Sequence, residues 1–213
     1  MPKIIITAGG TVEKIDAVRS ITNNSTGQLG TEIALAFSNK NNEIIYIKGK
    51  NAVSPNISDT TEITIESAAD LDTVLTQILA NGDVDAIIHA MAVSDFRIKN
   101  AQDIGKISSD NDEITLTLEK IPKTITKLRG LAPNAILVGF KLTSGLKQEN
   151  IIDKAHALLT KNNCDMVLAN DASNLTPNGH VGYLVKRDKS FRIYNGKKEI
   201  AQAIMQEVLK CLI

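Results

Sequence analysis

The chain has 213 residues, in which 24 Lys and Arg are balanced by 24 Asp and Glu, so the formal net charge is +0. This balance argues against the basic surface of a nucleic-acid-binding protein, and an aromatic content of 3% without tryptophan argues against stacking platforms for single strands. The length predicts one large domain that spans residues 1–213.

Cysteine use and the N-terminal sequence indicate the compartment. Cys164 and Cys211 are far apart and match no metal-binding spacing, and such sparse use of cysteine is typical of reducing conditions. The apolar run near the N-terminus is too short for a signal peptide or a membrane span. We therefore expect a cytoplasmic protein, in which matches to the N-glycosylation pattern at Asn23, Asn56 and Asn174 carry little weight.

Apolar β-branched runs alternate with amphipathic helical patterns along the chain. The runs predict strands at residues 3–7, 43–49, 61–67, 85–93, 134–140 and 164–170, and a hairpin within residues 182–194. Helical periodicity predicts helices at residues 26–39, 68–82 and 151–159 and from Lys198 onward. Continuous Ile and Val strands separated by helices are typical of a doubly wound α/β fold, a mostly parallel sheet with helices on both faces.

Residues 96–118 break this alternation. The segment is polar and irregular, and it ends in a strict apolar–polar alternation from Ile114 to Leu118. This pattern predicts an antiparallel excursion from the main sheet, either a flap or a dimer arm.

Unusual polar loops follow four of the predicted strands. They read "TAGGTVEKIDAVRSITNNSTGQLG", "MAVSDFR", "GFKLTSG" and "ANDAS". Because ligands in open α/β sheets bind outside the carboxyl ends of the strands, we expect these loops to meet at one cleft.

The first of these loops has two interpretations. Ser25 or Thr26 can cap the following helix, while Gly27 and Gly30 let the backbone approach an anion at the helix N-terminus. The alternative is a capped helix without a ligand. Neither a G-x-G-x-x-G fingerprint nor a G-K-[ST] phosphate loop is present in the sequence.

Structural roles also compete with functional ones in the other loops. The alternatives are a cap for Asp95, a surface side chain for Arg97, a solvated side chain for Lys106, a core position for Phe140 and an Asx turn for Asn170–Asp171. The three histidines, His89, His156 and His180, fit no triad or metal pattern, and His89 in an apolar strand is typical of a core residue. No serine lies in a nucleophile elbow.

Taken together, the motifs resemble those of the phosphopantothenate–cysteine ligase (phosphopantothenoylcysteine synthetase) family. The strings "ITAGGT", "VRSITNNSTG-xx-G", "AMAVSDFR", "GKISS", "GFKL" and "LANDAS" occur in that family's order and spacing, from about Lys3 to the C-terminal helix. The resemblance implies a Rossmann-like homodimer that joins 4′-phosphopantothenate to cysteine in coenzyme A biosynthesis. It also implies a nucleoside triphosphate, Mg²⁺ and an acyl-nucleotide intermediate, with release of pyrophosphate and then the nucleoside monophosphate.

Two details of the resemblance concern whether the ligase is fused to another enzyme and which nucleotide it uses. Many bacterial members are fused to a flavin-dependent decarboxylase, and the length of this chain predicts a stand-alone ligase. Bacterial members usually use CTP and eukaryotic members ATP. CTP is the first expectation, and ATP stays the alternative because the string "GFKLTSG" is more similar to the eukaryotic form.

The resemblance also assigns site residues. It implies nucleotide contacts by Gly9, Ser25, Gly27, Gly30, Lys106, Phe140 and Asn170, and phosphopantothenate contacts by Asn23, Met91, Ala92, Asp95 and, from the neighbouring subunit, Arg19. Asn23 and Lys106 would be catalytic, since an amide binds the acyl oxygen without adding charge and an ammonium offsets charge on departing pyrophosphate. We expect Asn24 to be free to vary, Lys161 to have no firm role, and Mg²⁺ to be held by the triphosphate and water.

Two other classes of function stay open at this level. A nicotinamide- or flavin-dependent oxidoreductase could share the fold, but the missing fingerprint and the missing acid after the second strand disfavour it. A non-enzymatic binding protein is disfavoured by the number of polar loops expected at one edge of the sheet.

Overall fold

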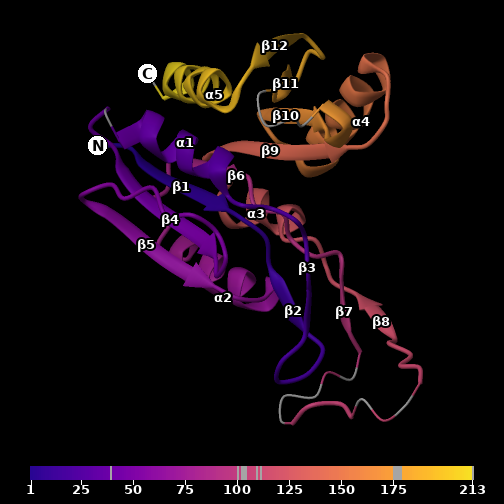
Figure 1. Ribbon diagram of the computed structural model, residues 1–213. Helices are drawn as coiled ribbons and strands as arrows, with labels where there is room; N and C mark the ends of the chain where they lie inside the picture. Colours follow the sequence, from indigo (N-terminus) through magenta and orange to yellow (C-terminus); the bar gives the residue numbers. More distant parts are fainter. Residues whose placement is uncertain are drawn as a thin grey trace.

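The computed structural model describes residues 1–38, 40–99, 101, 105–108, 110, 112–174 and 179–212. Its main sheet has eight strands in the order β12-β11-β10-β9-β6-β1-β4-β5 (Figure 1). The parallel strands are β1 (Lys3–Ala8), β4 (Glu43–Gly49), β5 (Thr60–Ile65), β6 (Ala86–His89), β9 (Ile136–Thr143) and β10 (Met166–Asp171). β11 (Val181–Lys186) and β12 (Phe191–Asn195) form an antiparallel hairpin at one edge. The predicted mostly parallel α/β sheet is confirmed.

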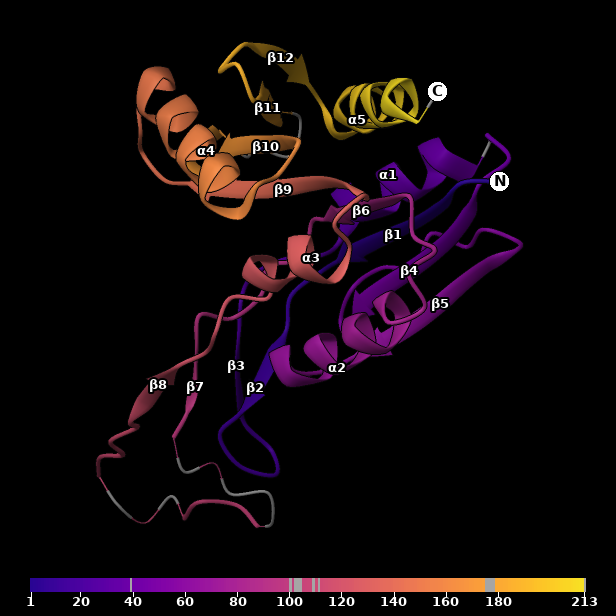
Figure 2. The same ribbon diagram turned by 180° about the vertical axis from the view of Figure 1, so that it is seen from behind.

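Helices cover both faces of this sheet. α1 (Gln28–Ser38) and α5 (Lys197–Cys211) lie side by side on one face, and α2 (Ala68–Leu79), α3 (Ile125–Leu131) and α4 (Gln148–Asn162) cover the other (Figures 1 and 2). Side chains of β1 alternate between the two layers: Ile4 and Ile6 pack with α1 and α5, and Ile5 packs on the opposite face. Full burial of each contributes roughly 1.5–3 kcal/mol, which explains the continuous apolar run.

Two short antiparallel ribbons project from the main sheet (Figure 2). β2 (Val12–Lys14) pairs with β3 (Ser20–Thr22), and β7 (Phe96–Ile98) pairs with β8 (Leu118–Lys120). We call these ribbons, the connecting residues 15–19 and the described residues 105–108 and 112–117 the arm. The predicted antiparallel excursion is confirmed for β7 and β8, but part of the prediction falls on residues 100, 102–104, 109 and 111, outside the described residues.

Several sequence-based boundaries were wrong. The alternation at residues 114–117 forms no strand; β8 begins only at Leu118. β6 ends at His89 rather than at residue 93, because the Ala90 amide turns back to the Thr7 carbonyl (3.2 Å) and the Ala92 amide to the Gly9 carbonyl (2.7 Å). α3, β2 and β3 were not predicted, since each is too short to show periodicity.

Among the helices in the described part of the chain, none is both long and apolar enough to cross a membrane.

Candidate active site

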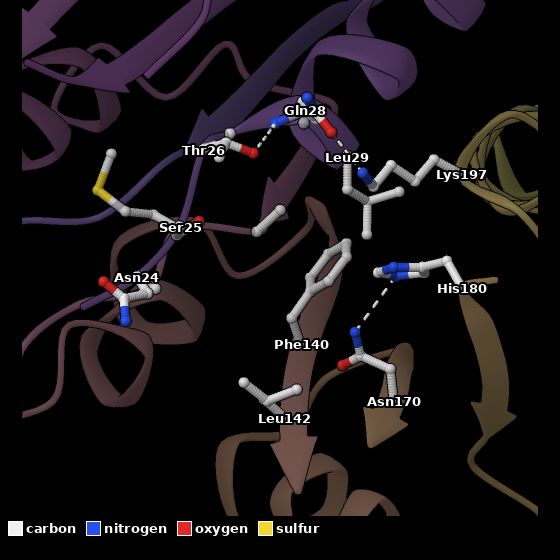
Figure 3. Close-up of a pocket in the computed structure, with 15 residues that line it drawn as sticks. Asn24, Ser25, Thr26, Gln28, Leu29, Phe140, Leu142, Asn170, His180 and Lys197 are labelled. Atoms are coloured by element: carbon white, nitrogen blue, oxygen red, sulfur yellow. Dashed lines mark hydrogen bonds between the residues drawn. The ribbon is translucent and has the colours of Figure 1, made fainter. Parts of the chain in front are cut away.

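A cleft of about 340 Å³ opens near the carboxyl ends of β1, β6, β9 and β10 (Figure 3). Its lining consists of Asn24, Ser25, Thr26, Gly27, Gln28, Leu29, Gly30, Ala90, Met91, Ala92, Phe140, Leu142, Asn170, His180 and Lys197. The four polar loops noted in the sequence therefore contribute to one site, as the position of ligands in open α/β sheets predicts. Of the expected residues, Ser25, Gly27, Gly30, Met91, Ala92, Phe140 and Asn170 lie on this lining.

The mouth of α1 forms one wall of the cleft. Gly27 precedes the helix at φ +76°, and a Cβ there would lie 2.9 Å from the Ala52 Cβ, so this position requires glycine. Thr26 Oγ1 accepts from the Gln28 amide at only 3.5 Å, and Ser25 Oγ has no hydrogen-bond partner within the described chain. All residues of α1 are described, and none in its first turn is acidic. The Thr31 amide donates to the Gly27 carbonyl, so the Leu29 and Gly30 amides are the first-turn N–H groups left for an anion.

Asn23 lies beside the cleft but does not line it. Its Nδ2 donates to the Ala92 carbonyl oxygen at 3.2 Å, and the Ala92 amide donates in turn to the Gly9 carbonyl. Asn23, Gly9 and the loop after β6 therefore hold one another in place. The neighbouring Asn24, which we expected to be free to vary, lines the cleft.

His89 supports the loop that follows β6 through a hydrogen bond with Thr7. Thr7 Oγ1 lies 3.0 Å from His89 Nδ1 and accepts from the Met91 amide at 3.2 Å. Burial lowers the pKa of His89 to about 4, so at neutral pH Nδ1 can accept the Thr7 hydroxyl proton. His89 is therefore the core residue that the sequence suggested, and it positions the backbone of Met91.

The opposite wall comes from β9, β10 and the last hairpin and helix (Figure 3). Phe140 and Leu142 occupy alternate positions of β9, and Leu142 is 55% exposed although it is apolar. Asn170 Nδ2 lies 3.3 Å from His180 Nε2, and burial, assisted by the charge of Lys197, lowers the pKa of His180. Lys197 Nζ donates to Gln28 Oε1.

Sequence reasoning missed several lining residues: Gln28, Leu29, Ala90, Leu142, His180 and Lys197. The alternation of β9 could have identified Leu142, because it shares a face with Phe140. His180 and Lys197 carry no such signal, since they reach the cleft only through the antiparallel hairpin and the packing of α5 beside α1.

Besides Gly9 and Asn23, three other expected site residues lie outside the lining. Asp95 pairs with Lys123 at 2.8 Å, and both side chains are more than half exposed. Lys106 is exposed on the arm. Arg19 also belongs to the arm and interacts with Asp16 and Ile107 of its own chain.

A buried carboxylate holds the loop that carries Lys106. Asp16 Oδ2 accepts from Arg19 Nη2 (2.6 Å) and from the Ile107 amide (3.1 Å), and Arg19 Nη2 also donates to the Ile107 carbonyl (2.8 Å). The Ala17 amide donates to the Gly105 carbonyl at 3.1 Å. Arg19 foremost, with the backbone amides, holds the pKa of Asp16 well below its usual range. Asp16 and Arg19 thus fix the backbone on either side of Lys106.

A second buried carboxylate organises the loop after β9. Asp171 accepts from Thr143 Oγ1 (2.7 Å), the Gly145 amide (2.9 Å) and the Leu146 amide (3.2 Å). It also accepts from the Ser173 amide at 3.0 Å, which is the Asx turn suggested by the sequence. The Ser173 and Thr143 hydroxyls hold the pKa of Asp171 well below its usual range. Asp171 is therefore a structural neighbour of Asn170 rather than a group facing the cleft.

The donor set of the cleft does not suit a protein-held metal ion. The described lining residues include no carboxylate, and the described chain contains no cluster of three or more His, Cys, Asp or Glu that could hold a metal. A divalent cation here would need its oxygen ligands from a bound anion and from water. What the cleft offers instead is an apolar wall facing a helix N-terminus and one ammonium group.

Comparison with known proteins gives consistent matches over the whole chain. A family model described as "DNA/pantothenate metabolism flavoprotein C-terminal domain" matches residues 2–212. The coenzyme A biosynthesis bifunctional protein CoaBC of Thermococcus kodakarensis is 33% identical over 211 residues, which cover 99% of this chain and 51% of that protein. This chain therefore spans about half the length of the curated relatives it matches.

Solved structures agree with these matches. The crystal structure of the DNA/pantothenate metabolism flavoprotein from Streptococcus pneumoniae is 30% identical, with a TM-score of 0.90 and 99% of both chains covered. The crystal structure of the C-terminal domain of a CoaBC protein is 28% identical, with a TM-score of 0.79, and covers 99% of this chain and 95% of that domain.

Proposed function

This chain belongs to the DNA/pantothenate metabolism flavoprotein C-terminal domain family, and on that basis we propose that it is a phosphopantothenate–cysteine ligase of coenzyme A biosynthesis. The match to one half of the bifunctional CoaBC proteins supports this assignment. The observation that carries it is the cleft, which joins an apolar wall of Phe140 and Leu142 to the N-terminus of α1. Such a site suits a ligand with a flat ring and a phosphate chain.

The ligand proposed for this cleft is a nucleoside triphosphate, CTP first and ATP as the alternative. Its base would lie against Phe140 near Asn170, and its phosphates would meet the N–H groups around Ser25, Gly27 and Gly30. Mg²⁺ would arrive with the triphosphate, because the described lining supplies no carboxylate for it. When bound, the ion neutralises phosphate charge.

The proposed reaction needs positioning rather than a protein nucleophile. A carboxylate oxygen of 4′-phosphopantothenate attacks the α-phosphorus, and pyrophosphate leaves with the electron pair of the broken P–O bond. The amine of cysteine then attacks the acyl carbon, loses a proton and displaces the nucleoside monophosphate. In this proposal Asn23, whose amide lies beside Ala92 at the edge of the cleft, binds the acyl oxygen.

We propose that the active protein is a homodimer formed through the arm. The arm exposes Phe96 (50%) and Leu118 (46%), and it carries Arg19 and Lys106 away from the cleft of their own chain. Contact between two arms would cover the apolar side chains and bring Arg19 to the phosphopantothenate site of the neighbour. Lys106, held on the same loop, would approach the triphosphate as the dimer forms.

The central test is pyrophosphate release. The protein is incubated with 4′-phosphopantothenate, cysteine, Mg²⁺ and either CTP or ATP, and we expect release with at least one nucleotide that depends on phosphopantothenate. No release with either would overturn the ligase assignment. Asn23→Asp should still form the acyl-nucleotide but pass it slowly to cysteine, whereas the exposed Asn81→Asp, outside the lining, should behave like wild type.

Mixed dimers test the role of Arg19. A subunit with Arg19→Ala and a subunit with Asn23→Asp form one intact site if Arg19 acts across the interface, so activity should return on mixing. If mixing restores nothing, Arg19 acts only within its own chain through Asp16, and its proposed contribution to the neighbouring site is wrong.

A further inference from the structure

Lys197 is the one cationic side chain among the described residues that line the cleft. It is the first residue of α5 and is half-buried. The other described lining residues are apolar or uncharged at neutral pH, including His180, whose pKa is lowered. The two lysines considered from the sequence do not fill this place, because Lys106 lies on the arm and Lys161 in the last turn of α4.

The ammonium of Lys197 has no carboxylate partner in the described chain. Its recorded hydrogen bond goes to the neutral Gln28 Oε1, whereas Lys123 and Lys48 near the same sheet edge pair with Asp95 and Glu62. A half-buried ammonium bonded only to a neutral amide loses hydration without gaining a counter-charge. An anion in the cleft would supply that counter-charge.

The position of Lys197 indicates which part of the cleft an anion would occupy. Gln28 is the first residue of α1, so the ammonium lies at the same helix N-terminus whose N–H groups face the cleft. Figure 3 shows Lys197 on the side of Leu29 and His180, while Asn24 lies across the cleft. Phe140 lies between these two sides, within reach of a ligand that also touches Lys197.

We propose that Lys197 is a phosphate-binding residue: its ammonium exchanges Gln28 Oε1 for phosphate oxygens of a nucleoside triphosphate bound against Phe140. This inference rests on the proposed function, which places a triphosphate in the cleft. No bond to carbon or phosphorus is made by Lys197; it supplies charge and hydrogen bonds. When the site is empty, Gln28 keeps the ammonium of Lys197 oriented. When the triphosphate binds, this hydrogen bond breaks and the ammonium contacts the phosphate oxygens.

The test compares two adjacent lysines. Lys197→Ala removes the ammonium in the cleft, and Lys198→Ala removes an exposed ammonium one residue along α5 that does not line the cleft. Binding of CTP, ATP and the matching nucleosides is measured by calorimetry in the presence of Mg²⁺. Lys197→Ala should weaken triphosphate binding by about tenfold to a hundredfold, the usual effect of losing a hydrogen bond to a charged group. Nucleoside binding should stay within about twofold, since the wall around Phe140 is unchanged.

Three further measurements sharpen the comparison. Lys197→Arg should restore most of the triphosphate affinity, because it keeps the charge and the donors. The affinity of Lys197→Ala for the triphosphate should depend less on salt than that of wild type. In the ligase assay, the KM for the nucleotide should rise while the KM for phosphopantothenate and for cysteine stays constant.

The results of these measurements distinguish a failure of the proposed function from a failure of the proposed role of Lys197. If wild type binds neither triphosphate, the proposed function fails and the role of Lys197 fails with it. If wild type binds a triphosphate and Lys197→Ala matches Lys198→Ala, the proposed function stands and the role of Lys197 is wrong. A raised KM for phosphopantothenate with unchanged nucleotide binding would likewise overturn the assignment, because the ammonium would then hold the other substrate.

Discussion

Gly30 and Gly130 both lie in helices, and replacing each by alanine should change stability in opposite directions. A Cβ at Gly30 in α1 would lie 2.4 Å from the Cβ of Ala8, which is 1% exposed in the central strand β1. A Cβ at Gly130 in α3 would meet no described atom within 4 Å. The same substitution therefore tests close packing at one site and open space at the other.

The magnitudes follow from two competing effects. Alanine stabilises a helix interior by about 0.8–1.0 kcal/mol relative to glycine. Overpacking a buried contact costs about 1–3 kcal/mol, and a methyl–methyl approach of 2.4 Å belongs at the upper end because neither Cβ can rotate away. Gly130→Ala should thus stabilise the protein by up to about 1 kcal/mol. Gly30→Ala should destabilise it by about 1–2 kcal/mol, the difference between the two effects.

Equilibrium unfolding in urea and thermal melting measure both changes. For a chain of this size, 1 kcal/mol corresponds to a shift of about 2–4 °C in Tm. Gly30→Ala should also weaken nucleotide binding, since relief of the overlap moves the start of α1 away from β1. A Gly30→Ala protein as stable as wild type would refute the close packing of α1 on β1, and a destabilised Gly130→Ala would refute the open space beside α3.

Three further predictions concern residues that support or line the cleft. His89 remains neutral in the fold while the unfolded chain takes up a proton below about pH 6.5, so wild type should lose about 2 kcal/mol of stability from this group between pH 7 and pH 5. His89→Gln should remove that loss, as urea unfolding at the two pH values will show. Asp16→Asn should loosen residues 105–108, seen as faster amide hydrogen exchange there, and lower activity as much as Lys106→Ala does. In wild type the low pKa of Asp16 keeps the carboxylate ionised, and this contact intact, at both pH values. Phe140→Leu should keep the apolar packing but weaken nucleoside binding by roughly 1 kcal/mol or more, measured by calorimetry.

The centre of the sheet was predictable because β1, β4 and β6 are buried on both faces. Runs such as Ile4–Ile6 and Ile44–Ile47 admit few other interpretations. The same signal extended β6 too far, because residues 90–93 are apolar and largely shielded. Of these, Ala92 forms only an isolated bridge with Gly10, and Val93 donates to Met91 within its own loop. The hairpin of β2 and β3 is invisible in the sequence, since three residues cannot display a period of two.

The site was predictable where residues follow strands. Phe140 and Asn170 end on the cleft because they lie near the carboxyl ends of β9 and β10. The approach of Lys197 to Gln28 depends on how α5 packs beside α1, which local sequence does not encode. The contact of Arg19 with Asp16 could be anticipated from their spacing, but the hydrogen bond from Arg19 to the Ile107 carbonyl could not.

The pairing of α1 with α5 also has a consequence for the order of events during synthesis. Gln28 and Lys197 are 169 residues apart in sequence, yet they meet on one wall of the cleft. While the ribosome is still making α5, the buried Ile33 and Phe37 of α1 have no covering helix, and the wall around His180 is incomplete. Contacts of such high sequence separation form late. A nascent chain that has already folded β1, α1 and β4 would therefore need protection from aggregation, and its cleft would gain the ammonium of Lys197 only when the last helix docks.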